Sequence, residues 1–534
     1  MVSGRAMRTF LLVLIGGAVC CNLTHSATAS GVFLMTLAQL PFFVLLATIY
    51  ANCRRWAGLR WMWSAVLFRA IFALYAVVTA IECFLCLFVG SGFTPSILTF
   101  LLQTDVSESH GFVHAYLINK RFVLYVGVLL LVCVLVWCLN VLLPRKPVPE
   151  TRLWIVVMLS AIFALAFPSY PYTSVSRLLM STYGYCQSRH QERDICADTK
   201  VRSARAGPQV IVLVIGEAFS KHHSSLYGYE KQTNPSLEAL KATGNLYPFY
   251  DVMAPYNKTH MMLKELLSVH SVDSPMPWAS YPLWPQIFKD AGYYVSFVSN
   301  QVPSSETSRN QSYFFQNKAV EQRCFDYRNS DVYRYDEGIL NELQTISNLC
   351  DNSRELTILH LKGQHIYAAY DFPHERFSVF QPSDYLPHKI SIDVRQVQEL
   401  ADYDNATLFN DYVVSSIIRW YERRNAVVVY LSDHGEEVYD YREFLGRSHG
   451  DNPTPEVIKY QYQVPFMIYV SDTYKKSNPQ VVERIAGAQD RKYMSDDLPH
   501  MLLGLSGIST DWYDARRDIL SADFDTTRLR IFGY

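Results

Sequence analysis

The chain has 534 residues, enough for roughly one to three domains; half of them are hydrophobic and only 18% are charged. With a mean hydropathy of +0.03, this composition is too apolar for a wholly soluble protein. The formal net charge is −1 and the pI about 6.9, so bulk charge indicates no nucleic-acid partner.

The hydrophobic residues concentrate in the first third of the chain. Five segments there approach the ~20 residues that a helix needs to cross the hydrocarbon core of a bilayer. They are residues 9–27, 31–51, 63–89, 122–143 and 153–167. The sequence therefore predicts an N-terminal α-helical membrane domain, residues 1–168, with five spans.

Basic residues predict the orientation of these spans. Lys and Arg gather before the first span, between the second and third, and between the fourth and fifth, whereas the loop after the first span has neither. The positive-inside rule then places the N-terminus in the cytoplasm and everything after the fifth span outside it. The stretch Ala27-Thr28-Ala29 also resembles a signal-peptidase site. Cleavage there would leave four spans and the same outward-facing C-terminal domain.

Two segments connect the spans with the rest of the chain. Residues 95–108 have helical spacing with one apolar face, which predicts an interfacial helix at the outer bilayer surface; a re-entrant helix is the alternative. Residues 169–206 are polar and without a long apolar run, so we interpret them as a connector. Residues 207–534 then form a soluble domain outside the cytoplasm.

Four cysteines lie beyond the membrane third: Cys186, Cys196, Cys324 and Cys350. A small even number in an oxidising compartment suits two disulfides. Three pairings are possible, and we expect the neighbours in sequence, Cys186–Cys196 and Cys324–Cys350. A metal site is the alternative, but no C-x-x-C spacing supports it.

The soluble part alternates short apolar runs with helical segments. Candidate strands begin at Gln209 and Ala426, and others lie at residues 294–299, 356–361 and 464–470. Helical patterns fall between them, for example at residues 408–420. This order predicts an α/β domain with a mostly parallel sheet that is covered on both faces.

Two of these strands end in metal-binding side chains. The first stops at Gly216-Glu217, and the second stops at Ser432-Asp433-His434. Buried parallel strands end where an α/β sheet presents its ligand crevice. A carboxylate and an imidazole there suit a divalent metal such as zinc, whereas a solvated turn is the alternative for either strand taken alone.

Three further residues are candidates for chemistry. Thr259 precedes a helical pattern, and a hydroxyl at a helix N-cap can bind phosphate with the free N–H groups of the first turn, although an ordinary N-cap is the commoner use. His365 follows one strand, and His449 lies close behind the Asp433–His434 pair. Each histidine could protonate a leaving oxygen or bind phosphate, or be structural.

Four motifs together carry a family resemblance: V-I-G-E-A, L-Y-G-Y-E-K-Q-T-N-P at 226–235, Y-D-N-A-T-L-F-N-D at 403–411 and S-D-H-G-E-E-V-Y-D at 432–440. They resemble the alkaline-phosphatase-like phosphoethanolamine transferases of Gram-negative inner membranes. The resemblance covers most of the chain, including its membrane part. It implies an alkaline-phosphatase-like domain in the periplasm, phosphatidylethanolamine as donor and lipopolysaccharide or its precursor as acceptor.

The resemblance also implies roles for single residues. It implies that Glu217, Thr259, Asp433 and His434 bind zinc, with a second ion possible, and that Thr259 is the nucleophile that carries phosphoethanolamine. His365 matches the histidines of the family better than His449 does.

In the membrane part, the resemblance implies an uncleaved first span and a lipid donor site at the interfacial helix. Thr104 and Glu108 match polar positions of that site, whereas Phe100 replaces an Asn that many members carry. The segments G-E-E-V-Y-D and G-R-S-H-G-D-N-P resemble the branch that modifies core sugars more than the branch that modifies lipid A.

Other functions remain as alternatives. A phosphoglycerol transferase or a phosphodiesterase could use the same fold. A sulfatase is disfavoured because the chain has no C/S-x-P-x-R segment. A non-catalytic membrane scaffold or sensor is expected to have lost metal ligands, yet Glu217, Asp433 and His434 are all present.

Overall fold

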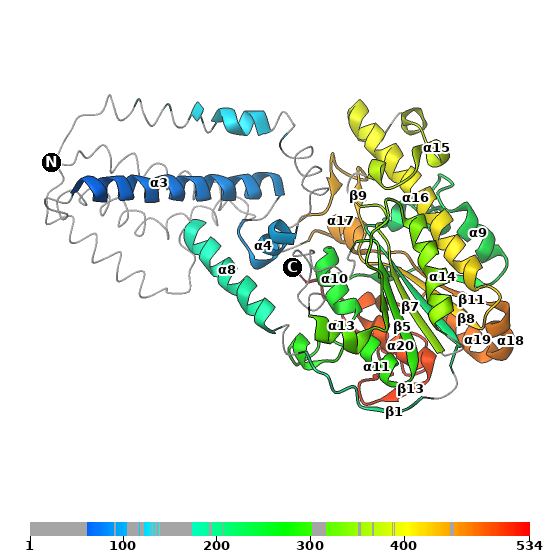
Figure 1. Cartoon of the computed structure of the whole chain (residues 1–534). Helices are drawn as coiled ribbons and strands as arrows, with labels where there is room; N and C mark the ends of the chain where they lie inside the picture. Colours follow the sequence, from blue (N-terminus) through cyan, green and yellow to red (C-terminus); the bar gives the residue numbers. More distant parts are fainter. Residues whose placement is uncertain are drawn as a thin grey trace. The chain divides into compact units, whose positions relative to one another are not determined.

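The computed structural model describes residues 61–89, 92–103, parts of 117–138, 174–191, 195–204 and 207–533, the last with gaps at 302–316, 351–353, 366–367, 387, 389 and 449–452 (Figure 1). The chain divides into two compact units. The first comprises Met1–Ser188 and Ser448–Asp451, and the second comprises Arg189–Arg447 and Asn452–Tyr534.

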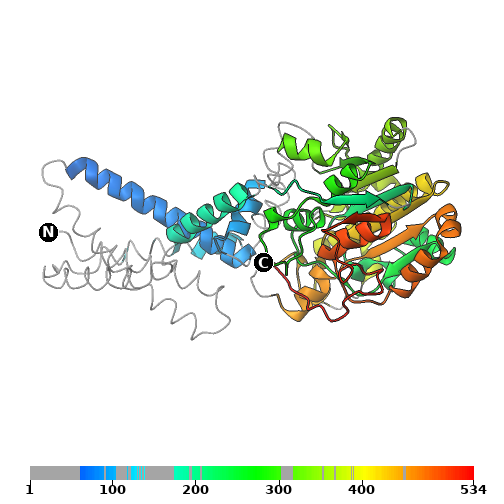
Figure 2. The ribbon, with the colours of Figure 1, turned by 90° about the horizontal axis from the view of Figure 1, so that it is seen from below.

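The first unit contains three long described helices. They are α3 (Trp61–Phe84), which continues as a π-helical turn at Leu85–Val89, α4 (Pro95–Gln103) and α8 (Ser174–Gln191). Helix α3 is a continuous ribbon in Figures 1 and 2.

Apolar and ionic contacts hold these helices together. Ile97 of α4 packs in a small core that also includes Val175 of α8 and Val78 of α3. Arg177 of α8 forms a two-pronged ion pair with Glu82 of α3, at 2.5 and 2.7 Å, and both side chains are buried. Helix α8 lies within the predicted connector, and its residues up to Ser188 belong to the first unit.

The predicted spans are only partly covered by the described residues. Residues 63–89 are helical throughout, and the described residues of 122–143 are helical. The other three predicted spans, together with Thr104 and Glu108, lie outside the described residues. None of the helices described has the length and apolarity that a membrane crossing requires.

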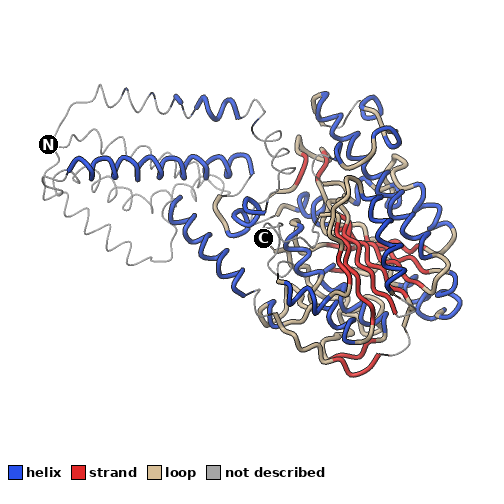
Figure 3. The backbone as a smooth tube through the Cα atoms, viewed as in Figure 1, coloured by secondary structure: helices blue, strands red, loops and turns tan. Residues whose placement is uncertain are grey.

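The second unit is built on a seven-stranded mixed sheet, shown with red strands in Figure 3. Across the sheet its strands are β3 (Leu246–Phe249), β11 (Phe466–Val470), β8 (Ala426–Ser432), β2 (Val210–Gly216), β7 (Arg354–His360), β5 (Tyr293–Ser299) and β6 (Tyr327–Arg328). The neighbours from β8 to β6 are parallel, whereas β11 is antiparallel to both β8 and β3.

All five predicted strands lie in this sheet, but β11 departs from the parallel expectation. Residues 433–465, between β8 and β11, hold only short elements: β9 (Glu437–Val438), β10 (Leu445–Gly446), α17 (Pro455–Val457) and a π-helical turn at Ile458–Tyr462. An antiparallel neighbour needs no crossover helix. The chain therefore leaves β8 and re-enters the sheet at the same edge.

Side chains alternate between the two faces of the sheet, so each face has its own hydrophobic core. Along β2, odd-numbered residues from Ile211 to Ile215 pack into one core and even-numbered residues from Val210 to Val214 into the other. Helices cover both faces (Figure 3). The first core receives α10 (Thr259–Leu266), α11 (Trp284–Asp290), α13 (Lys318–Cys324), α19 (Pro479–Gly487) and α20 (Leu498–Ser506); the second receives α9 (Pro235–Ala242), α14 (Ile339–Leu349) and α16 (Val394–Tyr421).

Neither predicted disulfide is present, because the described cysteines Cys186, Cys196, Cys324 and Cys350 form no disulfide bond. Cys324 ends α13 and packs in the first core, whereas Cys350 follows α14, whose apolar side chains pack in the second. Nearness in sequence therefore does not bring these two thiols together, because their helices cover opposite faces of the sheet. Burial raises the pKa of the Cys324 thiol to about 12.

Candidate active site

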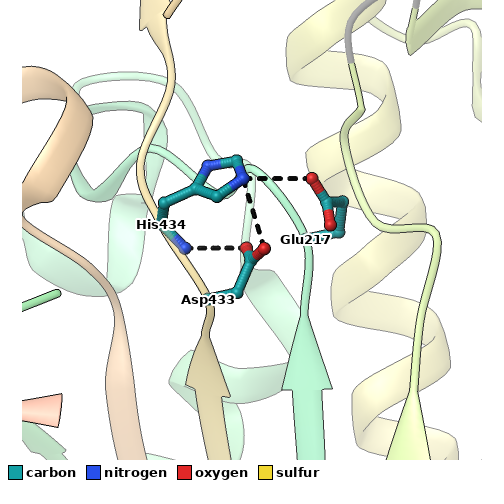
Figure 4. A group of neighbouring side chains, drawn as sticks. All are labelled: Glu217, Asp433 and His434. Atoms are coloured by element: carbon teal, nitrogen blue, oxygen red, sulfur yellow. Dashed lines mark hydrogen bonds and ion pairs between the residues drawn. The ribbon is translucent and has the colours of Figure 1, made fainter. Parts of the chain in front are cut away.

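Two neighbouring strands end in acidic and imidazole side chains. Strands β2 and β8 are parallel and in register, with Gly216 opposite Ser432. Glu217 directly follows β2, and Asp433 and His434 directly follow β8. The ligand atoms of these three buried residues lie within 4.8 Å of one another (Figure 4). The three predicted metal-binding side chains therefore meet at the carboxyl edge of the sheet.

The imidazole of His434 presents a lone pair to this cluster. Its Nδ1 is 2.9 Å from the carbonyl oxygen of Gly435, which can only accept, so Nδ1 carries the proton. Its Nε2 is 3.2 Å from Glu217 Oε1 and 3.2 Å from Asp433 Oδ2. Burial, together with the nearby charge of Arg447, lowers the pKa of His434 to about 4. The neutral ring is the form that binds a metal.

The carboxylate of Asp433 has one satisfied and one unsatisfied oxygen. Oδ1 accepts hydrogen bonds from the backbone N–H groups of Ala218 and His434, at 3.1 and 2.7 Å. Oδ2 makes no hydrogen bond to any residue that the structure describes. Burial and then the charge of Glu217 raise the pKa of Asp433 well above its usual range. A cation between the two carboxylates would relieve this repulsion, so the donor set fits a metal.

The backbone after β2 is shaped to bring these groups together. Ala218 has a φ of 54°, a left-handed conformation that is unfavourable for a residue with a Cβ. The hydroxyl of Tyr403 on α16 braces this turn, because it donates to the Ala218 carbonyl at 2.6 Å and accepts from Ser220 N–H at 2.7 Å. Gly363 also has a positive φ, and a Cβ there would lie 2.4 Å from the Glu217 carbonyl oxygen.

The hydroxyl of Thr259 lies in the same cluster. It donates to Glu217 Oε1 at 3.0 Å and is 3.2 Å from His434 Nε2. The helix begins at Thr259, and its N-cap is Lys258, so the prediction of an N-cap threonine is off by one residue. The hydroxyl is consequently directed at the carboxylate and imidazole instead of capping the helix.

The other predicted site residues are placed less fully. His365 follows β7, is half-buried and interacts electrostatically with the Glu217 carboxylate. His449 lies outside the described residues.

Two residues that the sequence reasoning missed also line the cluster. Gln301 donates to Glu217 Oε2 at 3.2 Å and to the Leu361 carbonyl at 2.7 Å. Arg447 Nη1 is 2.6 Å from His434 Nε2, and Arg447 Nε is 3.2 Å from Glu436 Oε2. Gln301 comes two residues after the end of β5, at the same sheet edge. A polar residue directly after a predicted strand was the sequence feature that could have identified it.

Comparisons with known proteins identify the family to which this domain belongs. The sulfatase family profile matches residues 209–508, which is more than half of the chain. The chain belongs to the sulfatase family. Phosphoethanolamine transferase EptC of Escherichia coli K12 is 28% identical over 495 residues, which cover 85% of this chain and 82% of that protein. Phosphoethanolamine transferase CptA of Salmonella typhimurium LT2 is 30% identical over 330 residues, covering 60% of this chain and 55% of that protein.

Two solved structures have a similar fold. The C-terminal periplasmic domain of E. coli EptC in complex with zinc has a TM-score of 0.55 and 29% identity, covering 64% of this chain and 94% of that one. The integral membrane phosphoethanolamine transferase EptA of Neisseria meningitidis has a TM-score of 0.63 over 97% of both chains; at 19% identity it shows a shared fold. The resemblance to lipopolysaccharide-modifying phosphoethanolamine transferases is thus confirmed, and the C-terminal domain is alkaline-phosphatase-like.

Proposed function

We propose that this chain transfers phosphoethanolamine from phosphatidylethanolamine to a lipopolysaccharide acceptor through a covalent intermediate on Thr259. The observation that carries the proposal is the Thr259 hydroxyl, which lies 3.0 Å from Glu217 and 3.2 Å from His434. A hydroxyl among metal-binding side chains suits nucleophilic phosphoryl transfer. The transferases of E. coli and Salmonella that this chain resembles support the choice of transferred group.

Zinc is the cofactor that the donor set fits best. Glu217, Asp433 and His434, with the Thr259 hydroxyl, would hold one ion, and the unpartnered Asp433 Oδ2 supports this assignment. Bound zinc would lower the cost of negative charge on the threonine oxygen.

The remaining chemistry falls to side chains. Thr259 Oγ1 attacks the donor phosphorus, and the bond from phosphorus to the glycerol oxygen breaks, so that diacylglycerol leaves. The hydrogen bond from Thr259 to Glu217 Oε1 gives the hydroxyl proton an acceptor. His365, which interacts electrostatically with Glu217, or His449 supplies a proton to the leaving glycerol oxygen. An acceptor hydroxyl then attacks the same phosphorus and gives its proton to the histidine that the first step deprotonated. The bond from phosphorus to Thr259 Oγ1 breaks, and Thr259 takes its proton back from Glu217.

The donor is a membrane lipid, so the proposal places the chain in the inner membrane with its catalytic domain in the periplasm. The five spans expected from the sequence would anchor it there. Core sugars are the acceptor that the sequence resemblance favours, with lipid A phosphates as the other position on the same class of molecule.

Mass spectrometry of lipopolysaccharide tests the function. Cells that express the chain should gain one phosphoethanolamine unit on lipopolysaccharide, and fragmentation should place that unit on the core sugars. Cells that express Thr259→Ala at equal levels are the control and should gain none. Unchanged lipopolysaccharide in cells with verified, zinc-loaded wild-type protein would contradict the proposal.

A further inference from the structure

A guanidinium lies in the site beside the predicted metal-binding side chains. Arg447 follows the short strand β10, and its side chain is 15% exposed. Its Nη1 is 2.6 Å from His434 Nε2, the nitrogen that carries the lone pair. A second contact, at 3.5 Å, runs from Nη1 to the carbonyl oxygen of Asn257, two residues before Thr259. Arg447 therefore contacts both the ligand cluster and the loop that leads to the nucleophile.

Arg447 and the Thr259 hydroxyl both approach the Nε2 atom of His434. His434 Nε2 is 2.6 Å from Arg447 Nη1 and 3.2 Å from Thr259 Oγ1. A phosphoryl group bonded to Thr259 would extend its oxygens into the space around this nitrogen, within reach of Nη1. A guanidinium only donates hydrogen bonds, and it matches the geometry of phosphoryl oxygens.

Glu436 holds this guanidinium in place. Its side chain is fully buried, and its carboxylate oxygens make no hydrogen bond to the described residues. It is 3.2 Å from Arg447 Nε. Burying a carboxylate with so few partners lowers the stability of the fold unless the carboxylate pairs with a positive charge. This ion pair at Nε leaves Nη1 directed toward His434.

The lone pair of His434 cannot serve both partners. When it is committed to a cation, Nη1 of Arg447 loses its 2.6 Å acceptor, so an N–H group of the guanidinium can donate to an incoming oxygen. We propose that Arg447 binds a non-bridging oxygen of the phosphoryl group transferred through Thr259, and that Glu436 is the positioning residue for its guanidinium. This proposal rests on the proposed function.

Binding of inorganic phosphate tests the assignment without requiring turnover. Full-length protein in detergent, loaded with zinc, is titrated with inorganic phosphate in a calorimeter, and its zinc content is measured in parallel. Arg447→Ala should weaken phosphate binding by about 10- to 100-fold, the value expected for a charged hydrogen bond, with zinc content unchanged. Arg447→Lys should recover part of the affinity, because it keeps the charge but loses the planar fork.

Arg516→Ala is the matched control, since Arg516 is 74% exposed and pairs only with Asp514 among the ion pairs of the described residues. It should bind phosphate as the wild type does. Glu436→Gln keeps the shape of the side chain and removes its charge. It should weaken phosphate binding less than Arg447→Ala, and the double variant should be no weaker than Arg447→Ala alone, because Glu436 acts through Arg447.

The outcomes separate the two proposals. Wild-type phosphate affinity in Arg447→Ala overturns the phosphoryl-binding role, and so does a loss of zinc in Arg447→Lys, which would make Arg447 a support for the metal ligands. Additive losses in the double variant overturn the positioning role of Glu436. Normal transfer by Thr259→Ala contradicts the proposed covalent step but leaves the phosphate measurement meaningful.

Discussion

At the residue scale, the two carboxylates at the edge of the sheet define what the site can bind. Asp433 is fully buried, and burial and Glu217 both raise its pKa. Removing Asp433 removes one donor of a three-residue cluster and leaves the zinc ligands incomplete. Asp433→Ala should therefore purify with little zinc, measured by elemental mass spectrometry. The surface variant Asp523→Ala should keep it, and full zinc in Asp433→Ala would refute the ligand assignment.

Gly363 lets two backbone segments approach each other beside Glu217. Its φ is +59°, and a Cβ would lie 2.4 Å from the Glu217 carbonyl oxygen. Gly363→Ala should lower the free energy of unfolding by about 1–3 kcal/mol and displace Glu217, so that zinc affinity falls as well. Gly487→Ala is the control, because nothing lies within 4 Å of a Cβ there. Equal melting temperatures for both variants would show that the close approach is not needed.

For single residues, the sequence predicts which side chains could bind a metal better than it predicts which side chains the fold brings beside them. Glu217, Asp433 and His434 were identifiable because each directly follows an apolar strand. Arg447 and Gln301 were missed, because only the folded loops bring them to His434 and Glu217. Thr259 was placed at the N-cap because hydroxyls usually cap helices, whereas here it bonds to a carboxylate instead.

At the element scale, a buried histidine fastens α16 to the segment after β2. His223 Nδ1 is 2.7 Å from Asp404 Oδ1, and His223 Nε2 is 3.6 Å from Asp440. Burial alone would lower the pKa of His223, but Asp404 and Asp440 raise it to about 10. Its stabilising contribution is therefore complete below the unfolded value of about 6.5 and is lost as pH rises toward 10.

The melting temperature should consequently fall between pH 6.5 and 10 in the wild type, and His223→Gln should flatten that fall. Each tenfold change in the proton affinity of the imidazole on folding is worth about 1.4 kcal/mol, as an upper bound. The neighbouring His222 is the control. Burial lowers its pKa, so it does not titrate in this range, and His222→Gln should keep the fall. An unchanged pH profile in His223→Gln would show that His223 is neutral in the folded protein.

Two arginines of the C-terminal segment, Arg517 and Arg528, form ion pairs with Asp273 and Asp497, and Arg528 also pairs with Asp496. Arg528 donates to Asp273, Asp496 and Asp497, and the last two carboxylates are buried. Burial and Asp496 raise the pKa of Asp497 to about 7 even with this arginine present. Arg528→Ala leaves buried like charges together and should destabilise the domain by about 3–5 kcal/mol at pH 7.

The deficit should shrink at pH 5, because protonation removes the repulsion in the variant. Thermal unfolding at both pH values measures it. Arg516→Ala, an exposed arginine of the same region, should change stability by no more than about 0.5 kcal/mol. A deficit in Arg528→Ala that is equal at pH 5 and pH 7 would place its cause outside this carboxylate cluster.

The sequence predicted the long elements and missed the short ones. Strands β2, β5, β7, β8 and β11 are continuous apolar runs, and their pattern is readable without a structure. Strand β3 contains Pro248, and β6 is only Tyr327–Arg328, so neither has the length or pattern that marks a strand.

At the scale of the whole molecule, the order of the strands in the sheet could not be predicted from the sequence. The alternation of strands and helices predicted a covered sheet, but not the spatial order in which β2 lies between β8 and β7. That order places Glu217 beside Asp433 and His434. The neighbouring hydrogen bond from Ala218 N–H to Asp433 joins residues that are 215 positions apart in the sequence. The predicted Cys324–Cys350 pair does not form for the same reason: helices α13 and α14, although close in sequence, cover opposite faces of the sheet.

The covalent step is the central claim, and the intact mass of the full-length protein tests it most directly. Zinc-loaded protein is exposed to phosphatidylethanolamine without acceptor, and the mass and released diacylglycerol are measured. We expect one phosphoethanolamine adduct, mapped to Thr259, with release of diacylglycerol. Thr259→Ser should retain some adduct, because the hydroxyl survives. Thr259→Ala should show neither adduct nor diacylglycerol while it keeps its zinc. An adduct on another residue, or normal transfer by Thr259→Ala, would contradict the account.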